Sequence, residues 1–160
     1  MEYKFLNNNQ TEKILEKLEY YGIKNVNLKL VKPGKEKIRG YSGNLTEREI
    51  NWINKIAQTN TLGLYLFHEY ENEIRLSIEA IHIFKEQITK NILEINDTQF
   101  NEWFNGQDLF LSDSEKEKLS QEEKGFKVIK YKNDFIGAGK FIGDRIVNYL
   151  PKERRRKIQR

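Results

Sequence analysis

The stretch FKVIKYKNDFIGAGKFIGDRIVNYL, residues 126–150, decides the fold of the C-terminal part of the chain. Apolar and polar residues alternate through much of it, and a polar turn falls near Asn133-Asp134. We therefore expect two extended segments, 126–134 and 135–150. Gly137 and Gly139 are two residues apart and share a strand face. Glycines at this spacing favour a sharp bend in the strand or the close approach of another backbone.

The same glycines, with Lys140 beside them, raise the alternative of a nucleotide-binding loop. A P-loop needs G-x-x-x-x-G-K-[S/T] between a strand and a helix, because the helix amides and the hydroxyl hold phosphate and magnesium. Here Phe141 follows the lysine and the extended pattern continues. In a dinucleotide fingerprint the third glycine would come one residue earlier. The sequence thus favours a structural role for these glycines, and we expect no cofactor.

Charge is distributed unevenly along the chain. Residues 125–160 hold 11 Lys/Arg against 3 Asp/Glu, and residues 1–124 hold the other 17 Lys/Arg against 21 Asp/Glu. The C-terminal quarter therefore carries a balance of +8 and the remainder −4, within a net charge of +4. Such an asymmetry favours a surface that binds a polyanion, and a solvated basic tail is the alternative on charge alone.

Composition excludes several other classes of protein. The chain has no cysteine, so it has no disulfide, thiolate zinc site or cysteine nucleophile. No apolar run approaches the roughly 18 residues that span a membrane, and MEYKFLNNNQ lacks the pattern of a secretory signal. We expect a soluble, cytoplasmic protein without a membrane partner.

The first half of the chain predicts a small α+β unit. Two hairpins are expected from the alternating runs at 26–31 with 37–43 and at 62–70 with 73–78. A helix with a cap at Asn9 or Thr11 precedes the first hairpin. A second helix begins at Thr46, which forms a capping box with Glu49 before Ile50, Ile53 and Ile56. We assign residues 1–83 to an N-terminal α+β domain.

The second half, residues 84–160, has the pattern of a small β-barrel with one short helix. Extended segments are expected at 91–95 and 108–112. Between them lies a helix capped by Asp97 and ended by Gly106. The charged run SEKEKLSQEEKG (114–125) is expected to form an exposed loop or a short mobile helix.

Catalytic and metal-binding residues are scarce. His68 and His82 are the two histidines, and neither lies in a metal-binding pattern, so both are interpreted as core-edge or surface residues. The acidic pairs of the 114–124 segment resemble solvated charge rather than a fixed carboxylate pair. We expect no metal and no enzymatic activity.

The basic C-terminal region supplies better candidates. Lys130 and Lys132 are expected to share a strand face, with Lys140 joining them across the hairpin. Arginine binds phosphate through two parallel hydrogen bonds, and an aromatic ring stacks on an unpaired base. The remaining candidates for this chemistry are Arg145, Tyr149, Lys152, Arg154, Arg155, Arg156 and Lys157.

The order of these features resembles a PUA-type RNA-binding domain. The likeness runs from about Lys85 to the end, through ITKNILEINDTQFNEWFNGQDLFL, GFKVIKYKNDFIGAGKF and IVNYLPKERR. It is most similar to the PUA-like tail of Sun/Fmu-type RNA cytosine-5 methyltransferases, and to related stand-alone ribosome-biogenesis proteins. In such proteins a small α/β, pre-PUA-like domain precedes the PUA-like β-barrel, which suits residues 1–83.

The resemblance implies residues that contact RNA. The loop after the first PUA helix corresponds to Asn105, Gly106, Gln107 and Asp108, and the late strands and C-terminal segment correspond to Lys140, Arg145, Asn148, Lys152 and Arg154. The acidic insertion at 114–124 departs from the pattern, and it could mask RNA or bind a protein. Methyltransferase activity does not carry over, because those enzymes need a methyl-donor domain and catalytic cysteines.

These observations lead to a non-catalytic RNA-binding protein that acts in rRNA maturation or in tRNA/rRNA modification. Its partner would be rRNA or tRNA. The first alternative is an adaptor that docks on an RNA methyltransferase or a ribosome-assembly factor. The second is an RNA-modifying enzyme, for which a cleft gathering Tyr41, Arg48 and His68 would be the sign.

Overall fold

The structure is a computed structural model that describes residues 2–120 and 124–157. It divides into two compact units, Met1–Ile88 and Thr89–Arg160. The division falls five residues after the boundary expected at residue 83. The assignment of residues 1–83 to a pre-PUA-like domain stays a prediction.

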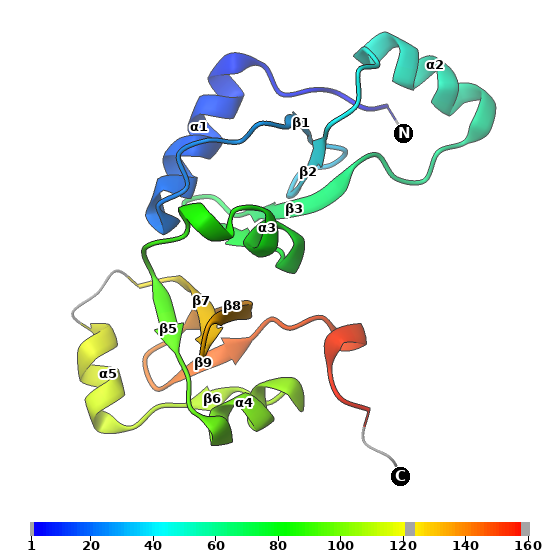
Figure 1. The fold of residues 1–160 in the computed structure, drawn as a ribbon. Helices are drawn as coiled ribbons and strands as arrows, with labels where there is room; N and C mark the ends of the chain where they lie inside the picture. Colours follow the sequence, from blue (N-terminus) through cyan, green and yellow to red (C-terminus); the bar gives the residue numbers. More distant parts are fainter. Residues whose placement is uncertain (1, 121–123, 158–160) are drawn as a thin grey trace. The chain divides into compact units, whose positions relative to one another are not determined.

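The first unit combines three α-helices with a four-stranded antiparallel sheet (Figure 1). In chain order its elements are α1 (Asn8–Leu18), η1 (Glu19–Tyr21), β1 (Lys29–Val31), β2 (Lys37–Tyr41), α2 (Glu47–Ala57), β3 (Leu64–Glu69), β4 (Ile74–Leu76), α3 (Ile78–Ile83) and η2 (Lys85–Gln87). The strands follow the order β1-β2-β3-β4. Both predicted hairpins, β1 with β2 and β3 with β4, are confirmed.

Capping side chains set the starts of the longer helices. Thr46 forms the predicted capping box at α2. The expected caps of the other two helices are wrong, because Asn7 caps α1 and Asn96 caps α4, each with a glutamine three residues on. At each of these caps the backbone is extended, which lets the side chain reach back to the third amide of the helix. Asp97 is instead the first residue of α4.

Buried aromatic and aliphatic side chains hold the first unit together. Its largest buried side chains include Tyr3, Leu18, Tyr21, Ile23, Ile38, Leu66, Phe67 and Ile81. The Tyr21 hydroxyl donates to the Ile74 carbonyl at 2.6 Å, and burial raises the pKa of this phenol well above its ordinary value. A buried hydroxyl therefore has the partner that its burial requires.

A carboxylate with two lysine partners joins α1 to the sheet. Glu69, at the end of β3, accepts from Lys17 at 2.9 Å and from Lys32 at 2.5 Å. Burial alone would raise the pKa of Glu69, but the hydrogen bonds from the two lysines outweigh it and the pKa is lowered. The ionised carboxylate is thus the form that the fold stabilises.

The second unit is built on a curled five-stranded sheet with two helices. Its elements are β5 (Ile92–Glu94), α4 (Asp97–Phe104), β6 (Leu109–Phe110), α5 (Asp113–Ser120), β7 (Phe126–Tyr131), β8 (Asp134–Phe141), β9 (Arg145–Asn148) and η3 (Lys152–Arg154). The order is β5-β7-β8-β9-β6, with β5 parallel to β7 and the other pairs antiparallel. Among the described residues β5 and β6 are the two edges, so the sheet is a half-barrel. The α+β class is confirmed.

The predicted segment 135–150 is two strands rather than one. Gly143 has a φ of 113°, and it lies in the break between β8 and β9. A left-handed residue at this point reverses the chain, so β9 pairs back on β8, with Phe141 opposite Ile146. The third glycine of the opening stretch therefore makes a turn, and β8 continues in extended conformation through Lys140.

Gly137 and Gly139 leave room for a tryptophan against one face of this sheet. A Cβ at Gly137 would lie 3.2 Å from Trp103 Cζ2, and one at Gly139 would lie 3.2 Å from Trp103 Cη2 and 2.3 Å from Ile146 Cγ2. Trp103 is fully buried. The predicted close approach of another backbone occurs at Gly139, where a Cβ would lie 3.0 Å from the Val147 carbonyl oxygen. At Gly137 the close neighbour is the Trp103 side chain.

The acidic segment forms a short helix, one of the two structures expected for it. Residues 113–120 form α5, and Leu119 is only 3% exposed. Glu115 accepts from the Ser112 amide at 2.7 Å and from Gln99 Nε2 at 3.1 Å, which attaches α5 to α4. The rest of the predicted insertion, at 121–123, lies outside the described residues.

No helix within the described ranges is both long and apolar enough to cross a bilayer. The cytoplasmic location stays a prediction.

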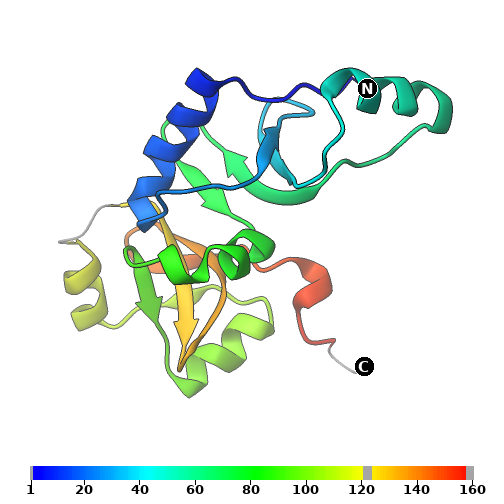
Figure 2. The same cartoon turned by 45° about the horizontal axis from the view of Figure 1, so that its top comes forward.

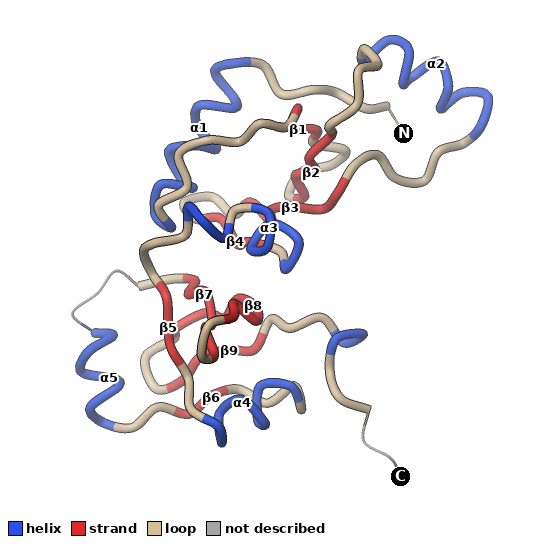
Figure 3. Tube along the Cα trace, in the orientation of Figure 1, coloured by secondary structure: helices blue, strands red, loops and turns tan. Residues whose placement is uncertain are grey.

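The tube in Figure 3 shows loops on both sides of α2, which leave this helix at the edge of the first unit.

Candidate nucleic-acid interface

The loop at 105–108 connects α4 to β6, and its turn depends on Gly106. This residue has a φ of 80°, in the left-handed region that favours glycine, and its amide donates to the Trp103 carbonyl at 3.0 Å. A Cβ at Gly106 would lie 2.7 Å from Arg155 Cδ. The glycine therefore ends the helix as predicted and leaves room for the C-terminal segment to cross.

Asn148 fixes this loop from β9. Its Nδ2 donates to the carbonyls of Trp103 and Gln107, at 2.9 Å each, and its Oδ1 accepts from the Leu150 amide at 2.8 Å. The Asn148 amide donates to Asp108 Oδ1 at 2.9 Å. The side chain thus positions the loop. Direct contact between Asn148 and RNA stays a prediction.

The C-terminal segment folds back along α4. Arg155 Nε donates to the Leu150 carbonyl at 3.0 Å, and the Arg156 amide donates to the Phe104 carbonyl at 2.7 Å. Arg156 Nη1 donates to Asn101 Oδ1 at 2.9 Å. These contacts bring the two predicted sets of residues, the loop and the basic tail, to one place in the second unit.

We call this place the loop–tail surface. It consists of Asn105, Gly106, Gln107, Lys152, Arg154, Arg155 and Arg156. Lys152, Arg154 and Arg156 have exposed side chains, as do Asn105 and Gln107. The run 152–156 contains four cations and one acid. A cationic, hydrogen-bonding surface on an ordered backbone is suited to binding a polyanion.

The lysines of the β7–β8 hairpin are not gathered as expected. Lys132 lies in the turn after β7 with a φ of 53°, so it does not share a strand face with Lys130. Lys130 pairs with Phe135, whereas Lys140 pairs with Phe126. Phe126 and Lys130 are four residues apart on β7, so Lys140 lies about 13 Å along the strand from Lys130. The expectation of one lysine cluster across this hairpin is wrong, because the antiparallel register puts Lys130 and Lys140 at opposite ends.

Arg145 lies beside an exposed aromatic ring that the sequence analysis missed. Its Nε is 3.5 Å from Asp108 Oδ2, and its guanidinium lies 5.6 Å from the centre of the Phe110 ring. Phe110 is 65% exposed and pairs with Arg145 across β6 and β9. The alternation in DLFLS, where Leu109 and Leu111 are buried, could have indicated that Phe110 faces outward.

Two other residues of the basic region serve the domain itself. Lys127 is fully buried, and its Nζ donates to Asn91 Oδ1 at 2.8 Å, so one of the counted cations is not on the surface. Tyr149 is half-buried, with its ring 5.3 Å from that of Phe126 in an edge-on contact. The proposed stacking of Tyr149 on a base stays a prediction.

The histidines show no sign of a catalytic arrangement. His68 Nε2 lies 3.4 Å from Glu36 Oε2, and burial and the nearby Arg75 lower the pKa of this imidazole. His82 is exposed. Among the residues that the structure describes, no group of three or more His, Cys, Asp or Glu side chains could hold a metal ion.

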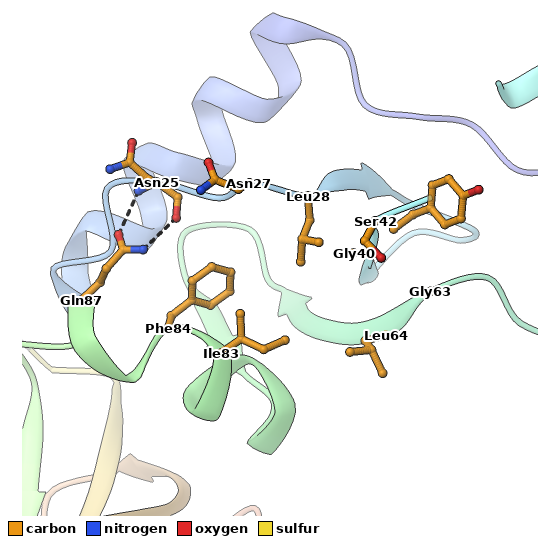
Figure 4. A pocket seen from close by; sticks show the side chains of 11 residues that line it. Asn25, Asn27, Leu28, Gly40, Ser42, Gly63, Leu64, Ile83, Phe84 and Gln87 are labelled. Carbon is orange, nitrogen blue, oxygen red and sulfur yellow. Dashed lines mark hydrogen bonds between the residues drawn. The ribbon is translucent and has the colours of Figure 1, made fainter. Parts of the chain in front are cut away.

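The first unit has a hollow of about 610 Å³. Figure 4 shows the side chains that line it. Leu28 and Ile83 point toward one another across it, and Tyr41 is among the residues that line it. Arg48 lines a separate hollow beside α2, and His68 lines neither. These two hollows therefore do not gather the three side chains expected of an enzymatic cleft. The expectation that the protein is not an enzyme stays a prediction.

Comparison with known proteins places the second unit in a recognised class. Residues 90–156 match the family described as "Methyltransferase RsmF PUA domain". "Ribosomal RNA small subunit methyltransferase F" of Vibrio cholerae is 28% identical over 92 residues, which is 58% of this chain and 18% of that protein. The protein of the same name from Aliivibrio fischeri is 30% identical over 92 residues, which is 58% of this chain and 18% of that protein. The one from Vibrio atlanticus is 32% identical over 99 residues, which is 62% of this chain and 17% of that protein.

The second unit is thus a PUA-like domain. It resembles the PUA region of these ribosomal RNA methyltransferases, and the resemblance stated from the sequence is confirmed. The chain spans about a fifth of the length of the curated relatives it matches. Because Thr89–Arg160 comprises 72 residues, a match over 92 residues that contains the PUA region includes at least 20 residues of the first unit.

Proposed function

We propose that the protein binds structured RNA and acts in the modification or maturation of ribosomal RNA, without performing the chemistry itself. The main support is the PUA-like domain at residues 90–156, because its relatives are named as methyltransferases of small-subunit rRNA. The loop–tail surface adds a physical reason. Its four cations lie on a segment that is attached to α4 where the Arg156 amide donates to the Phe104 carbonyl, next to the loop that Asn148 holds in place.

In this proposal the cations position the RNA and the loop contributes selectivity. Arg154 and Arg156 contact phosphates, which gives affinity without sequence preference. Asn105 and Gln107 are exposed amides next to them, able to donate to and accept from the edge of an unpaired base. The chain has no cysteine, which supports a role in RNA binding rather than in cysteine-dependent methyl transfer.

A salt titration tests the proposal directly. Binding to fragments of small-subunit rRNA is measured at several salt concentrations, and the affinity should fall linearly on a log–log plot as counterions are released. Replacing Lys152, Arg154 and Arg156 together with glutamate should weaken binding by at least about tenfold and reduce the slope. The matched control is Lys118→Glu on α5, which should have little effect. Salt-independent binding, or none, contradicts the proposal.

The adaptor alternative is separated by purifying the protein from cells with and without ribonuclease. If RNA is the partner, associated ribosomal components are lost after nuclease treatment. A methyltransferase or assembly factor that stays bound after nuclease, and is unaffected by the triple glutamate variant, would favour the adaptor.

A further inference from the structure

Helix α2 presents two large apolar residues to solvent. Only Ile50 of this helix is buried, at 4% exposure, whereas Trp52 and Ile56 are 65% and 66% exposed. Trp52 and Ile56 are one turn apart and share a face. Figures 1 and 2 both show α2 at the periphery of the first unit, away from α1 and α3. Together Trp52 and Ile56 form an exposed apolar patch, and tryptophan is enriched among the residues that carry binding energy at interfaces.

Polar side chains on other faces fix the helix in place. Asn51 binds both backbone groups of Tyr3, accepting from its amide and donating to its carbonyl at 2.8 Å each. Glu47 Oε2 accepts from the Phe5 amide at 2.7 Å. Because these contacts hold α2 without using the Trp52 face, the indole is presented on a fixed backbone.

Cations flank this indole. Arg48 lies one turn before Trp52 and Lys55 lies one turn after it, so both can reach past the ring on the helix surface. Two acids of the first turn also lie near these cations. Glu47 accepts from the Phe5 amide, and Glu49 accepts from the Thr46 amide and hydroxyl at 2.8 and 2.7 Å as part of the cap. A hollow of about 770 Å³ runs beside the ring. Arg48, Trp52 and Lys55 line it together with the acids Glu2, Glu47 and Glu49.

We propose that Trp52, Arg48 and Lys55 form a second RNA contact, which stacks an unpaired base on the indole and holds its flanking phosphates. An aromatic ring between cations is the combination by which proteins bind single-stranded nucleic acid. The inference rests on the proposed function for its ligand, but it assigns a separate surface, in the first unit, that reads single-stranded rather than structured RNA.

The test compares a hairpin RNA with the same hairpin carrying a single-stranded oligoadenylate tail. The wild-type chain should bind the tailed RNA about tenfold more tightly, as expected for one stacked base and its phosphates. Trp52→Ala should remove this advantage, and Trp52→Phe should keep most of it. Arg48→Glu with Lys55→Glu should reduce it. Ile56→Ser, which changes an equally exposed neighbour without an aromatic ring, is the matched control.

Tryptophan fluorescence tests the stacking on Trp52 directly, without relying on a difference in affinity between RNAs. Stacking of a base quenches the emission of an exposed indole, and Trp103, the second tryptophan, is fully buried. Titration of oligoadenylate should therefore quench wild-type emission and leave Trp52→Phe, in which only Trp103 remains, unchanged. An unchanged wild-type signal overturns the inference.

The outcomes separate the two proposals. If the wild-type chain does not bind the hairpin RNA, the proposed function is refuted. Hairpin binding with a tail advantage that survives Trp52→Ala refutes only the second contact. If Ile56→Ser has the same effect as Trp52→Ala, or if Trp52→Ala instead releases a protein that ribonuclease does not, the face docks a protein and the RNA inference fails.

Discussion

The two tryptophans of the chain have opposite environments on comparable helices. Trp103 in α4 is fully buried and Trp52 in α2 is 65% exposed, although both helices begin with a capping box. The difference comes from what each helix faces. Gly137 and Gly139 remove the side chains that would exclude Trp103 from the sheet, whereas α2 is held by polar contacts on its other faces. One tryptophan is therefore a structural element and the other is available to a ligand.

The largest effect should come from truncating the buried indole. Trp103→Ala should lower the free energy of unfolding by about 3–5 kcal/mol, because a large side chain is removed from a packed core. Trp52→Ala should change it by less than about 0.5 kcal/mol. Urea denaturation followed by far-UV circular dichroism measures both. Equal losses in the two variants would break the comparison.

A smaller loss in the free energy of unfolding is expected when a side chain is added at Gly139, next to the Trp103 indole. A Cβ at Gly139 would lie 2.3 Å from Ile146 Cγ2, so Gly139→Ala should cost about 1–3 kcal/mol in urea denaturation. Gly34 is the matched control, since a Cβ there meets nothing within 4 Å. A neutral Gly139→Ala would mean that β8 and β9 can separate without cost.

The loop at 105–108 depends on Asn148 for its position. Asn148→Ala leaves the carbonyls of Trp103 and Gln107 without its two hydrogen bonds, so it should destabilise the protein by about 1–2 kcal/mol. It should also weaken RNA binding at the loop–tail surface, because the loop loses its fixed position. Thr98→Ala, at an exposed position of α4, should change neither the midpoint of unfolding nor the affinity.

The smallest effect is a dependence on pH in the first unit. The pKa of Glu69 is lower in the folded protein than in the unfolded chain. The ionised carboxylate therefore contributes fully to the free energy of unfolding above the unfolded pKa of about 4.3, and this contribution is lost as the pH falls through the folded pKa. Glu69→Gln should lower stability by about 1 kcal/mol at pH 7 and show less further loss at pH 3. Urea midpoints at both values check this against Glu16→Gln, an exposed control on α1. A parallel decline in all three proteins would contradict it.

Much of the local structure could be predicted from the sequence because it depends on neighbouring residues. The capping box at Thr46, the hairpins and the left-handed Gly106 all follow from short patterns. The failures have local causes as well. Asn7 and Asn96 replaced the expected caps, and Gly143 broke a run that alternation alone describes as one strand.

The candidate site was predicted less completely. The cations of 152–156 and the loop at 105–108 were both named, but only the fold-back of the chain along α4 brings them together. Lys132 was misplaced, because a left-handed turn residue cannot continue the face of a strand. The exposure of Ile56 does not follow from its helical spacing with Ile50 and Ile53, because that spacing is typical of a buried face.

By itself, the sequence determined the elements, the uneven charge and the likeness to a PUA domain, because caps, turns, alternation and composition act over a few residues. Tertiary structure alone decided which cations share a surface, which are buried, as Lys127 is, and which tryptophan faces solvent. The physical reason is that burial and register depend on segments far apart in the chain. The two glycines beside Lys140 show this plainly, since their partner is an indole more than thirty residues earlier.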